Sequence, residues 1–333
     1  TDSKRKSYLT DADAFINPAY YSRTANPYLR VRDENGDYVY DKDIEGYSGR
    51  HLDFNFVEEM NNTDYTLKNR SIKPMISIDY KVASWLKLQT QFSMQLEHTA
   101  SEKIADQNTY YVRKYREKAR NGEGVSFLPD GGIIQNATTD MNQYQWKIQG
   151  EFDKVFADKH AVDVMMGLEM RGSKTTDIQT KGFGYDPNSL TTKPLVFPEG
   201  NTMINDASFR QYKKTFNEDR FLSYYMTASY TYDYRYTFFG SLRYDGSNMF
   251  GVDRKYKYLP LWSVSAAWNI NQESFLSNVE WISDLKLRAS YGIQGNVDKN
   301  TSPEIVGEWG NITILPGNNE SNITVSSPPN QYL

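Results

Sequence analysis

The sequence predicts an all-β membrane protein, an antiparallel transmembrane β-barrel. The first reason is a strict alternation of apolar and polar side chains, clearest over residues 222–233. Because side chains in a strand have a period of two, this segment has one apolar and one polar face. The second reason is its length, since a strand that crosses a bilayer at a tilt needs about 9–11 residues. The third is that such segments recur in pairs along the chain.

Eight strands with this pattern are predicted, and they form four antiparallel pairs. The pairs are 72–82 with 86–97, 144–153 with 162–171, 220–233 with 236–246, and 262–270 with 285–293. The first three pairs are joined by tight turns, and the fourth by a longer one. Pro74 cannot donate to a strand ladder, so we expect a strand end or a bulge there. Residues 52–57 are a candidate for a ninth strand.

The connections between pairs are much longer than those within them. Long loops are predicted at about 1–50, 99–141, 173–218 and 297–333. Outer-membrane barrels have short periplasmic turns and long extracellular loops. A soluble β-sandwich would show the same alternation, but strand length and loop rhythm favour the barrel.

The two faces of each strand are assigned by the cost of placing charges in lipid, up to about 2–4 kcal/mol near the bilayer midplane. Apolar positions should therefore point to lipid and charged positions to the lumen. The lipid set is Trp146, Phe152, Met166, Leu168, Tyr224, Phe238, Trp268 and Leu287. The lumen set is Lys147, Glu151, Glu169, Arg243 and Arg288. A register error of one residue would exchange the two sets.

Composition excludes several classes of function. The 333 residues carry a formal net charge of −4 with both signs interspersed, which argues against a nucleic-acid partner. The chain has no cysteine, so it has neither disulfides nor thiolate metal sites. It has three histidines, far apart in sequence, and no hydrolase, nucleotide or metalloprotease motif, so we expect no enzyme activity, no cofactor and no metal. Residues 33–37 resemble the start of a calcium loop, but without its closing Glu they fit a plain Asn-Gly turn better.

One block of the chain resembles a known family. It reads RYDGSNMFG at 243–251 and YLP at 258–260, continues as SVSAAWNI at 263–270, and ends as ISDLKLRASYGIQGN at 282–296. The block is similar to the SusC/RagA family of TonB-linked outer-membrane transporters from Bacteroidetes-type bacteria. Residues 69–73 and the hairpins upstream also resemble it, so the likeness covers nearly the whole chain. Leu261 and Trp262 depart from it, because many members carry a small residue after the proline.

The resemblance implies a larger barrel of about 22 strands around a plug. On this interpretation, residues 1–333 are a partial TonB-dependent receptor barrel of about eight or nine strands, without the plug, the TonB box and the C-terminal strands. It also implies active import of glycan or peptide oligomers across the bacterial outer membrane, with a SusD-like lipoprotein lid and the TonB complex as partners. The alternatives are a soluble β-sandwich that binds carbohydrate, and a siderophore-type TonB receptor.

Recognition of cargo is expected in the long loops, because loops on a rigid scaffold commonly carry binding surfaces. Exposed aromatic rings there offer apolar contact to sugars or peptides at small entropic cost. The candidate substrate-binding residues are Tyr20, Tyr28, Tyr110, Tyr111, Tyr185 and Trp309, and the same loops hold Tyr21, Phe183 and Phe197. The competing interpretation is that these rings pack the loops together. Residues 109–120 are predicted to form a basic helix that is either solvated or in contact with the lid or an acidic ligand.

Overall fold

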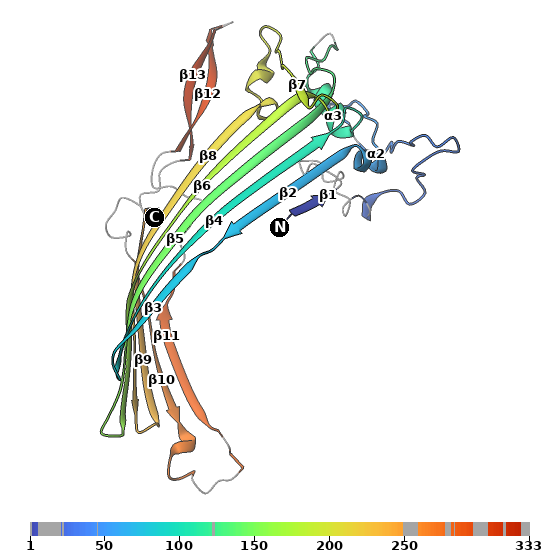
Figure 1. Cartoon of the computed structure of the whole chain (residues 1–333). Coiled ribbons are helices and arrows are strands. Elements are labelled where there is room, and N and C mark those ends of the chain that lie inside the picture. The colour runs from blue at the N-terminus through green and yellow to red at the C-terminus, as the bar shows by residue number, and fades with distance from the viewer. Residues whose placement is uncertain are drawn as a thin grey trace.

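The computed structural model describes residues 2–5, 21, 23–44, 46–121, 124–248, 259–276, 281–282, 284–295, 306–315 and 318–327. Most of these residues form one strongly curved antiparallel sheet (Figure 1). The order along the sheet is β1-β2-β4-β5-β6-β8-β9-β10-β11, with β3 paired to β4 and β7 paired to β6. A separate hairpin pairs β12 (Val306–Leu315) with β13 (Asn318–Ser327).

The strands of the main sheet differ widely in length. Their bounds are β1 Asp2–Arg5, β2 Thr63–Ile72, β3 Met75–Ala83, β4 Leu86–Ala105, β5 Gly132–Phe156, β6 His160–Asp186, β7 Thr191–Lys193, β8 Tyr212–Tyr232, β9 Tyr236–Ser247, β10 Leu259–Asn269 and β11 Lys286–Ile293. All eight predicted strands are present. Residues 52–57 are not a ninth strand, because 52–55 are irregular and Phe56 begins helix α2 (Phe56–Asn61).

Strand pairing places the predicted lipid set on one face. Trp146 lies opposite Met170, Leu168 opposite Tyr224, and Phe238 opposite Ala266. The large apolar side chains of this face are exposed, with no described element packed over them. A two-layer sandwich would bury that face against a second sheet, so the soluble-sandwich alternative is wrong for the described chain.

The break between β2 and β3 confirms the expectation for Pro74. β2 pairs with residues 96–105 of β4, and β3 pairs with residues 86–93. β2 and β3 are therefore one strand that is interrupted at Lys73 and Pro74. The Pro74 carbonyl still accepts a hydrogen bond from the Met94 N–H at 3.0 Å. The proline therefore interrupts the ladder where the missing N–H can be tolerated.

Two of the tight turns have the backbone that a hairpin requires. Ala157 and Asp158 have φ of 48° and 57°, and Asp233 and Tyr234 have φ of 49° and 59°. Two consecutive residues with positive φ are typical of the type I′ turn, whose twist matches that of the flanking strands. These turns lie together at one end of the sheet, the lower end in Figure 1.

The loop boundaries predicted at 99–141 and 173–218 are wrong. β4 continues to Ala105, β5 already begins at Gly132, β6 continues to Asp186, and β8 begins at Tyr212. With its 25 residues, β5 is about 80 Å long at 3.3 Å per residue, far more than a bilayer needs. The connections themselves are therefore only 106–131 and 187–211.

Short elements gather at the other end of the sheet, beside the upper ends of β2, β4, β5 and β6 (Figure 1). They are α2, helix α3 (Tyr110–Lys118), β7, and the 3₁₀ helices η2 (Thr202–Asn205) and η3 (Ala207–Phe209). We call them, with their connecting loops, the cap. α3 confirms the predicted helix at 109–120, although it ends before Gly122. None of the helices in the described ranges is long and apolar enough to span a membrane.

Candidate functional site

The cap is held on the inner face of the sheet by a hydrophobic cluster. Ala105, Ile133 and Phe183 contribute from the upper ends of β4, β5 and β6, and all three are fully or almost fully buried. Side chains at odd-numbered positions of these three strands lie on one face of the sheet, which also carries the polar residues of the predicted lumen set. The three buried residues have odd numbers and therefore lie on this face. α3 and η3 supply the opposing side chains, among them Val112 and Phe209. The cap therefore folds over the face that carries the predicted lumen set.

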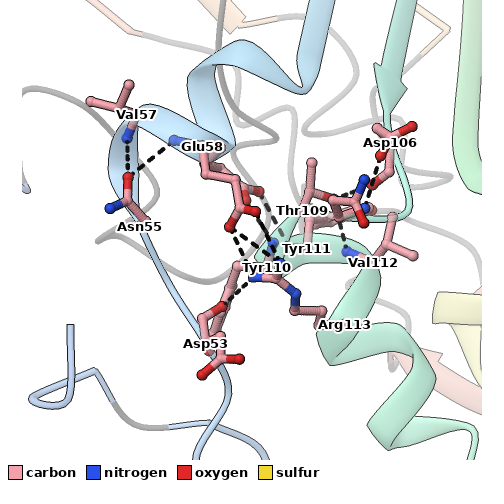
Figure 2. Close-up of polar contacts among 12 residues, drawn as sticks. Asp53, Asn55, Val57, Glu58, Asp106, Thr109, Tyr110, Tyr111, Val112 and Arg113 are labelled. Atoms are coloured by element: carbon pink, nitrogen blue, oxygen red, sulfur yellow. Dashed lines mark hydrogen bonds and ion pairs between the residues drawn. The ribbon is translucent and has the colours of Figure 1, made fainter. Parts of the chain in front are cut away.

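A buried ion pair joins the two helices of the cap (Figure 2). Asn55 begins α2 by accepting hydrogen bonds from the N–H groups of Val57 and Glu58. Both terminal guanidinium nitrogens of Arg113 in α3, Nη1 and Nη2, donate to Glu58 at 3.1–3.2 Å. Arg113 also donates to the carbonyl of Asp53 at 2.7 Å. A bidentate pair of this kind fixes orientation as well as distance.

Glu59 belongs to α2, and its carboxylate reaches the beginning of α3, where helix N–H groups have no partner within the helix. Its carboxylate accepts from the N–H of Tyr110 at 2.6 Å and of Tyr111 at 3.3 Å. Thr109, the N-cap, accepts from Val112. Burial raises the pKa of Glu59 to about 7, although the two N–H groups and Arg113 favour its charged form.

The raised pKa of Glu59 predicts a pH-dependent cap. Because the pKa is higher in the folded state than the unfolded value of 4.5, the folded state binds this proton more tightly. The associated stability is full below about pH 4.5 and is lost as pH rises through about 7. Hydrogen exchange of the α3 amides in the full-length protein, corrected for intrinsic rates, should show protection falling between about pH 5 and 8. The Glu59→Gln variant should abolish the dependence, and a wild-type profile that is flat or rising would contradict the assignment.

Most of the predicted loop aromatics are not exposed. Tyr110 and Tyr111 lie at the start of α3, and Phe183 and Tyr185 lie in β6; their exposed fractions are between 0% and 7%. Their expected exposure is therefore wrong, and packing within the cap accounts for them. Their burial was missed because sequence periodicity does not show that the cap folds inward.

The other predicted aromatics divide differently. Tyr28 is 92% exposed, which leaves it available to a ligand. Tyr21 stacks on Phe56 and donates to Asp41, and Phe197 packs on Phe127. Trp309 lies in β12, and Tyr20 lies outside the described residues. The candidates whose side chains the structure describes therefore do not form one exposed site.

The lower inner wall of the sheet is a network of polar side chains. The Nη2 of Arg243 lies 3.7 Å from the Oε2 of Glu169, and Arg243 also donates to Ser223 and Asp245. Tyr225 donates to Gln149 at 3.0 Å. Glutamines recur along this face of β4, β5 and β6, at 89, 91, 95, 135, 143, 145, 149 and 179. Such a wall suits water and hydroxyl-rich solutes, and it agrees with the predicted lumen assignment of Glu169 and Arg243.

Beneath the cap, the inner wall contains a pocket of about 440 Å³. Its lining includes four cationic side chains, Lys103, Lys181, Arg210 and Lys213, and no carboxylate. The remaining lining residues are Tyr65, Ser101, Gln135, Asn136, Ala137, Gln179, Thr180 and Ala207. We call this the basic pocket. It was not predicted from the sequence, because all of these residues except Tyr65 fall in segments predicted as loops, and they become neighbours only through strand pairing.

Residues 33–37 form the predicted turn. The Oδ1 of Asp33 accepts from the N–H groups of Asn35 and Asp37, both at 2.9 Å, and Gly36 has a φ of 89°. Across the part of the chain that the structure describes, no group of three or more His, Asp or Glu residues could hold a metal.

The chain is similar to several known receptors. It is 25% identical over 250 residues to TonB-dependent receptor P26 of Formosa agariphila, a match that covers 72% of this chain and 24% of P26. It is 32% identical over 133 residues to TonB-dependent receptor SusC of Bacteroides thetaiotaomicron, covering 40% of this chain and 12% of SusC. No protein-family model matches the chain.

Solved structures agree on the fold. The RagAB peptide transporter superposes with a TM-score of 0.66 at 18% identity, covering 90% of this chain and 30% of that one. The closed-closed state of the RagAB peptide importer gives a TM-score of 0.67 with the same coverage. The matched relatives are named as receptors or transporters, not enzymes. This chain spans less than a third of the length of each of these relatives. The names of the relatives and the shared fold confirm the resemblance to TonB-linked transporters that the sequence indicated.

Proposed function

From the resemblance of this chain to the SusC/RagA family of TonB-linked outer-membrane transporters, we propose that it forms part of the barrel wall of a TonB-dependent importer. The observation that carries the proposal is the two-faced sheet, which has an exposed apolar outer face and a polar inner wall. A lipid-facing barrel with a wet lumen requires this division. The matched relatives are named TonB-dependent receptors, and these names support the TonB complex as the energy source of import.

The proposal includes a location and partners. The lipid set forms an apolar band that sits in the outer membrane. The type I′ turns lie on the periplasmic side and the cap lies on the cell surface, because outer-membrane barrels have short periplasmic turns and long extracellular loops. A SusD-like lipoprotein covers the surface opening, and a plug and a TonB box belong to other parts of the receptor. Residues 1–333 contribute one continuous section of the barrel. A siderophore-type receptor would share this sheet, but relatives named SusC and RagAB peptide transporter support oligomer import instead.

Uptake in the producing cells tests the proposal. The receptor gene is deleted and complemented, and depletion of glycan and peptide oligomers from the medium is followed by mass spectrometry. Deletion should abolish uptake of one oligomer class, and removal of TonB from the complemented strain should abolish it equally. Uptake that continues without TonB would contradict energised import.

A matched exchange locates specificity. Segments 106–131 and 187–211 are replaced by those of a related receptor of known cargo, and in a second chimera the turns 157–158 and 233–234 are replaced as a control. We expect preference to follow the cap segments and to ignore the turns. Preference that follows neither would place recognition outside the exchanged segments.

A further inference from the structure

We propose that the basic pocket binds an acidic sugar unit of the imported cargo, one that carries a carboxylate or a sulfate. The inference rests on the proposed import function and adds the chemical class of the substrate. It begins from strand register, which places Tyr65 beside Lys103, Lys103 beside Gln135, and Gln135 beside Lys181. Since neighbouring strands lie about 4.8 Å apart, these four side chains form one row across β2, β4, β5 and β6.

A second row completes the floor of the pocket. Ser101 lies beside Ala137, Ala137 beside Gln179, and Gln179 beside Lys213 of β8. The cap contributes Arg210 from above, directly after η3. Cations therefore converge on one cavity from three strands and from the cap.

The charges of the pocket are not neutralised by the described part of the protein. No described carboxylate forms an ion pair with any of the four pocket cations, Lys103, Lys181, Arg210 and Lys213. On the same face, Asp177 lies two positions from Gln179 along β6, but the hydroxyls of Thr139 and Thr215 donate to it. The four cations outnumber this nearby carboxylate and repel one another, and an anionic ligand would reduce that repulsion.

Two of the cations are held in position. The Nζ of Lys181 donates to the hydroxyl of Tyr115 at 2.8 Å and to the carbonyl of Ser208 at 3.2 Å. The Nζ of Lys103 lies 5.3 Å from the centre of the Tyr65 ring. The cap is fixed in turn by Lys118, which pairs with Asp206 at 2.8 Å. Such preorganisation reduces the entropic cost of binding.

The other lining groups favour a sugar over a peptide. Gln135, Gln179 and Ser101 offer donors and acceptors suited to hydroxyls, and a volume of about 440 Å³ lies within the usual range for small-ligand sites. Apolar side chains that would hold peptide residues are few in the lining, which contains two alanines and one tyrosine. An acidic peptide is therefore the alternative that the test must distinguish.

The test measures binding to the full-length purified receptor by calorimetry. The acidic probes are hexagalacturonate and sulfated maltohexaose, their neutral counterparts are methyl-esterified hexagalacturonate and maltohexaose, and the peptide probe is hexaglutamate. We expect at least one acidic sugar to bind about tenfold or more tightly than its neutral counterpart, which corresponds to about 1.4 kcal/mol. Which of the two binds identifies the anion.

The variants are matched in charge and differ in face. Lys103→Gln/Lys213→Gln removes two pocket cations, and Lys174→Gln/Lys214→Gln removes two cations from the outer face of β6 and β8. We expect the first pair to weaken acidic-sugar binding about tenfold or more and the second to leave it unchanged. Equal effects of the two pairs, equal binding of acidic and neutral sugars, preference for hexaglutamate, or no binding of either acidic sugar would each overturn the inference.

The same strains separate this inference from the proposed function. If import depends on TonB but the Lys103→Gln/Lys213→Gln receptor binds and imports as wild type does, the pocket assignment fails and the importer stands. If the wild-type receptor binds the acidic sugar through these lysines but uptake is independent of TonB, the importer proposal fails and the pocket stands.

Discussion

Replacing Met166 by arginine is expected to lower the free energy of unfolding of the barrel by about 2–4 kcal/mol. Met166 is the middle of five alternating apolar residues of β6, from Val162 to Met170, and it is 55% exposed on the outer face. It therefore lies near the centre of the apolar band, where a charge in lipid is most costly. Reversible urea unfolding of the full-length receptor in lipid vesicles measures the change.

The neighbouring residue provides the control. Met165 carries the same side chain but lies on the inner face, opposite Glu151 and Thr227. The Met165→Arg variant places an equal charge beside a carboxylate in a polar lumen, and we expect a loss below about 1 kcal/mol. If Met165→Arg were the more damaging change, the two faces of the sheet would be reversed, because face assignment depends on a single residue of register.

Replacing Arg113 by methionine is expected to open the cap. Glu58 is 9% and Arg113 is 22% exposed, so removing the arginine leaves a carboxylate largely buried without its partner. Loss of one partner from a buried pair costs about 3–5 kcal/mol, and the partial exposure of Arg113 places the expectation near 3 kcal/mol. Hydrogen exchange of the α3 amides in the full-length receptor reports this local free energy of opening.

Two further variants test the cause of that loss. Arg116 lies one turn beyond Arg113 along α3 and pairs with Asp130, which is 82% exposed, so Arg116→Met should cost less than about 1 kcal/mol. Glu58→Met/Arg113→Met removes both charges and should recover part of the protection lost in Arg113→Met. Equal protection in Arg113→Met and Arg116→Met would show that the buried pair does not hold the cap.

The sequence predicted correctly where chemistry differs between the two faces of a strand. From 144 to 153 and from 162 to 171, apolar residues on one face of the sheet alternate with polar residues on the other, and this part of each strand was found. The turns after Phe156 and Tyr232 were found for the same reason, since the alternation stops there. The interruption at Pro74 followed from its missing N–H.

The sequence failed where the two faces become alike. Above Tyr144, the outer positions of β5 are polar, with Asn142 and Asp140, and His98 of β4 lies 2.6 Å from Asp140. Because the outer positions here are polar as well, the alternation disappears although the backbone ladder continues. This is why 99–141 and 173–218 were predicted as loops and why the aromatics of the cap were expected on the surface.

The sequence by itself thus determined the long antiparallel strands, the two faces of the sheet and the family that the chain resembles. Only the tertiary structure decided how far the strands continue, which way the cap folds, and which residues form the basic pocket. Lys103, Gln135, Lys181 and Lys213 are separated by 32, 46 and 32 positions in the sequence, and pairing across four strands brings them to one cavity. The physical reason is that alternation reports the surroundings of one strand, whereas a site across several strands depends on the register between them.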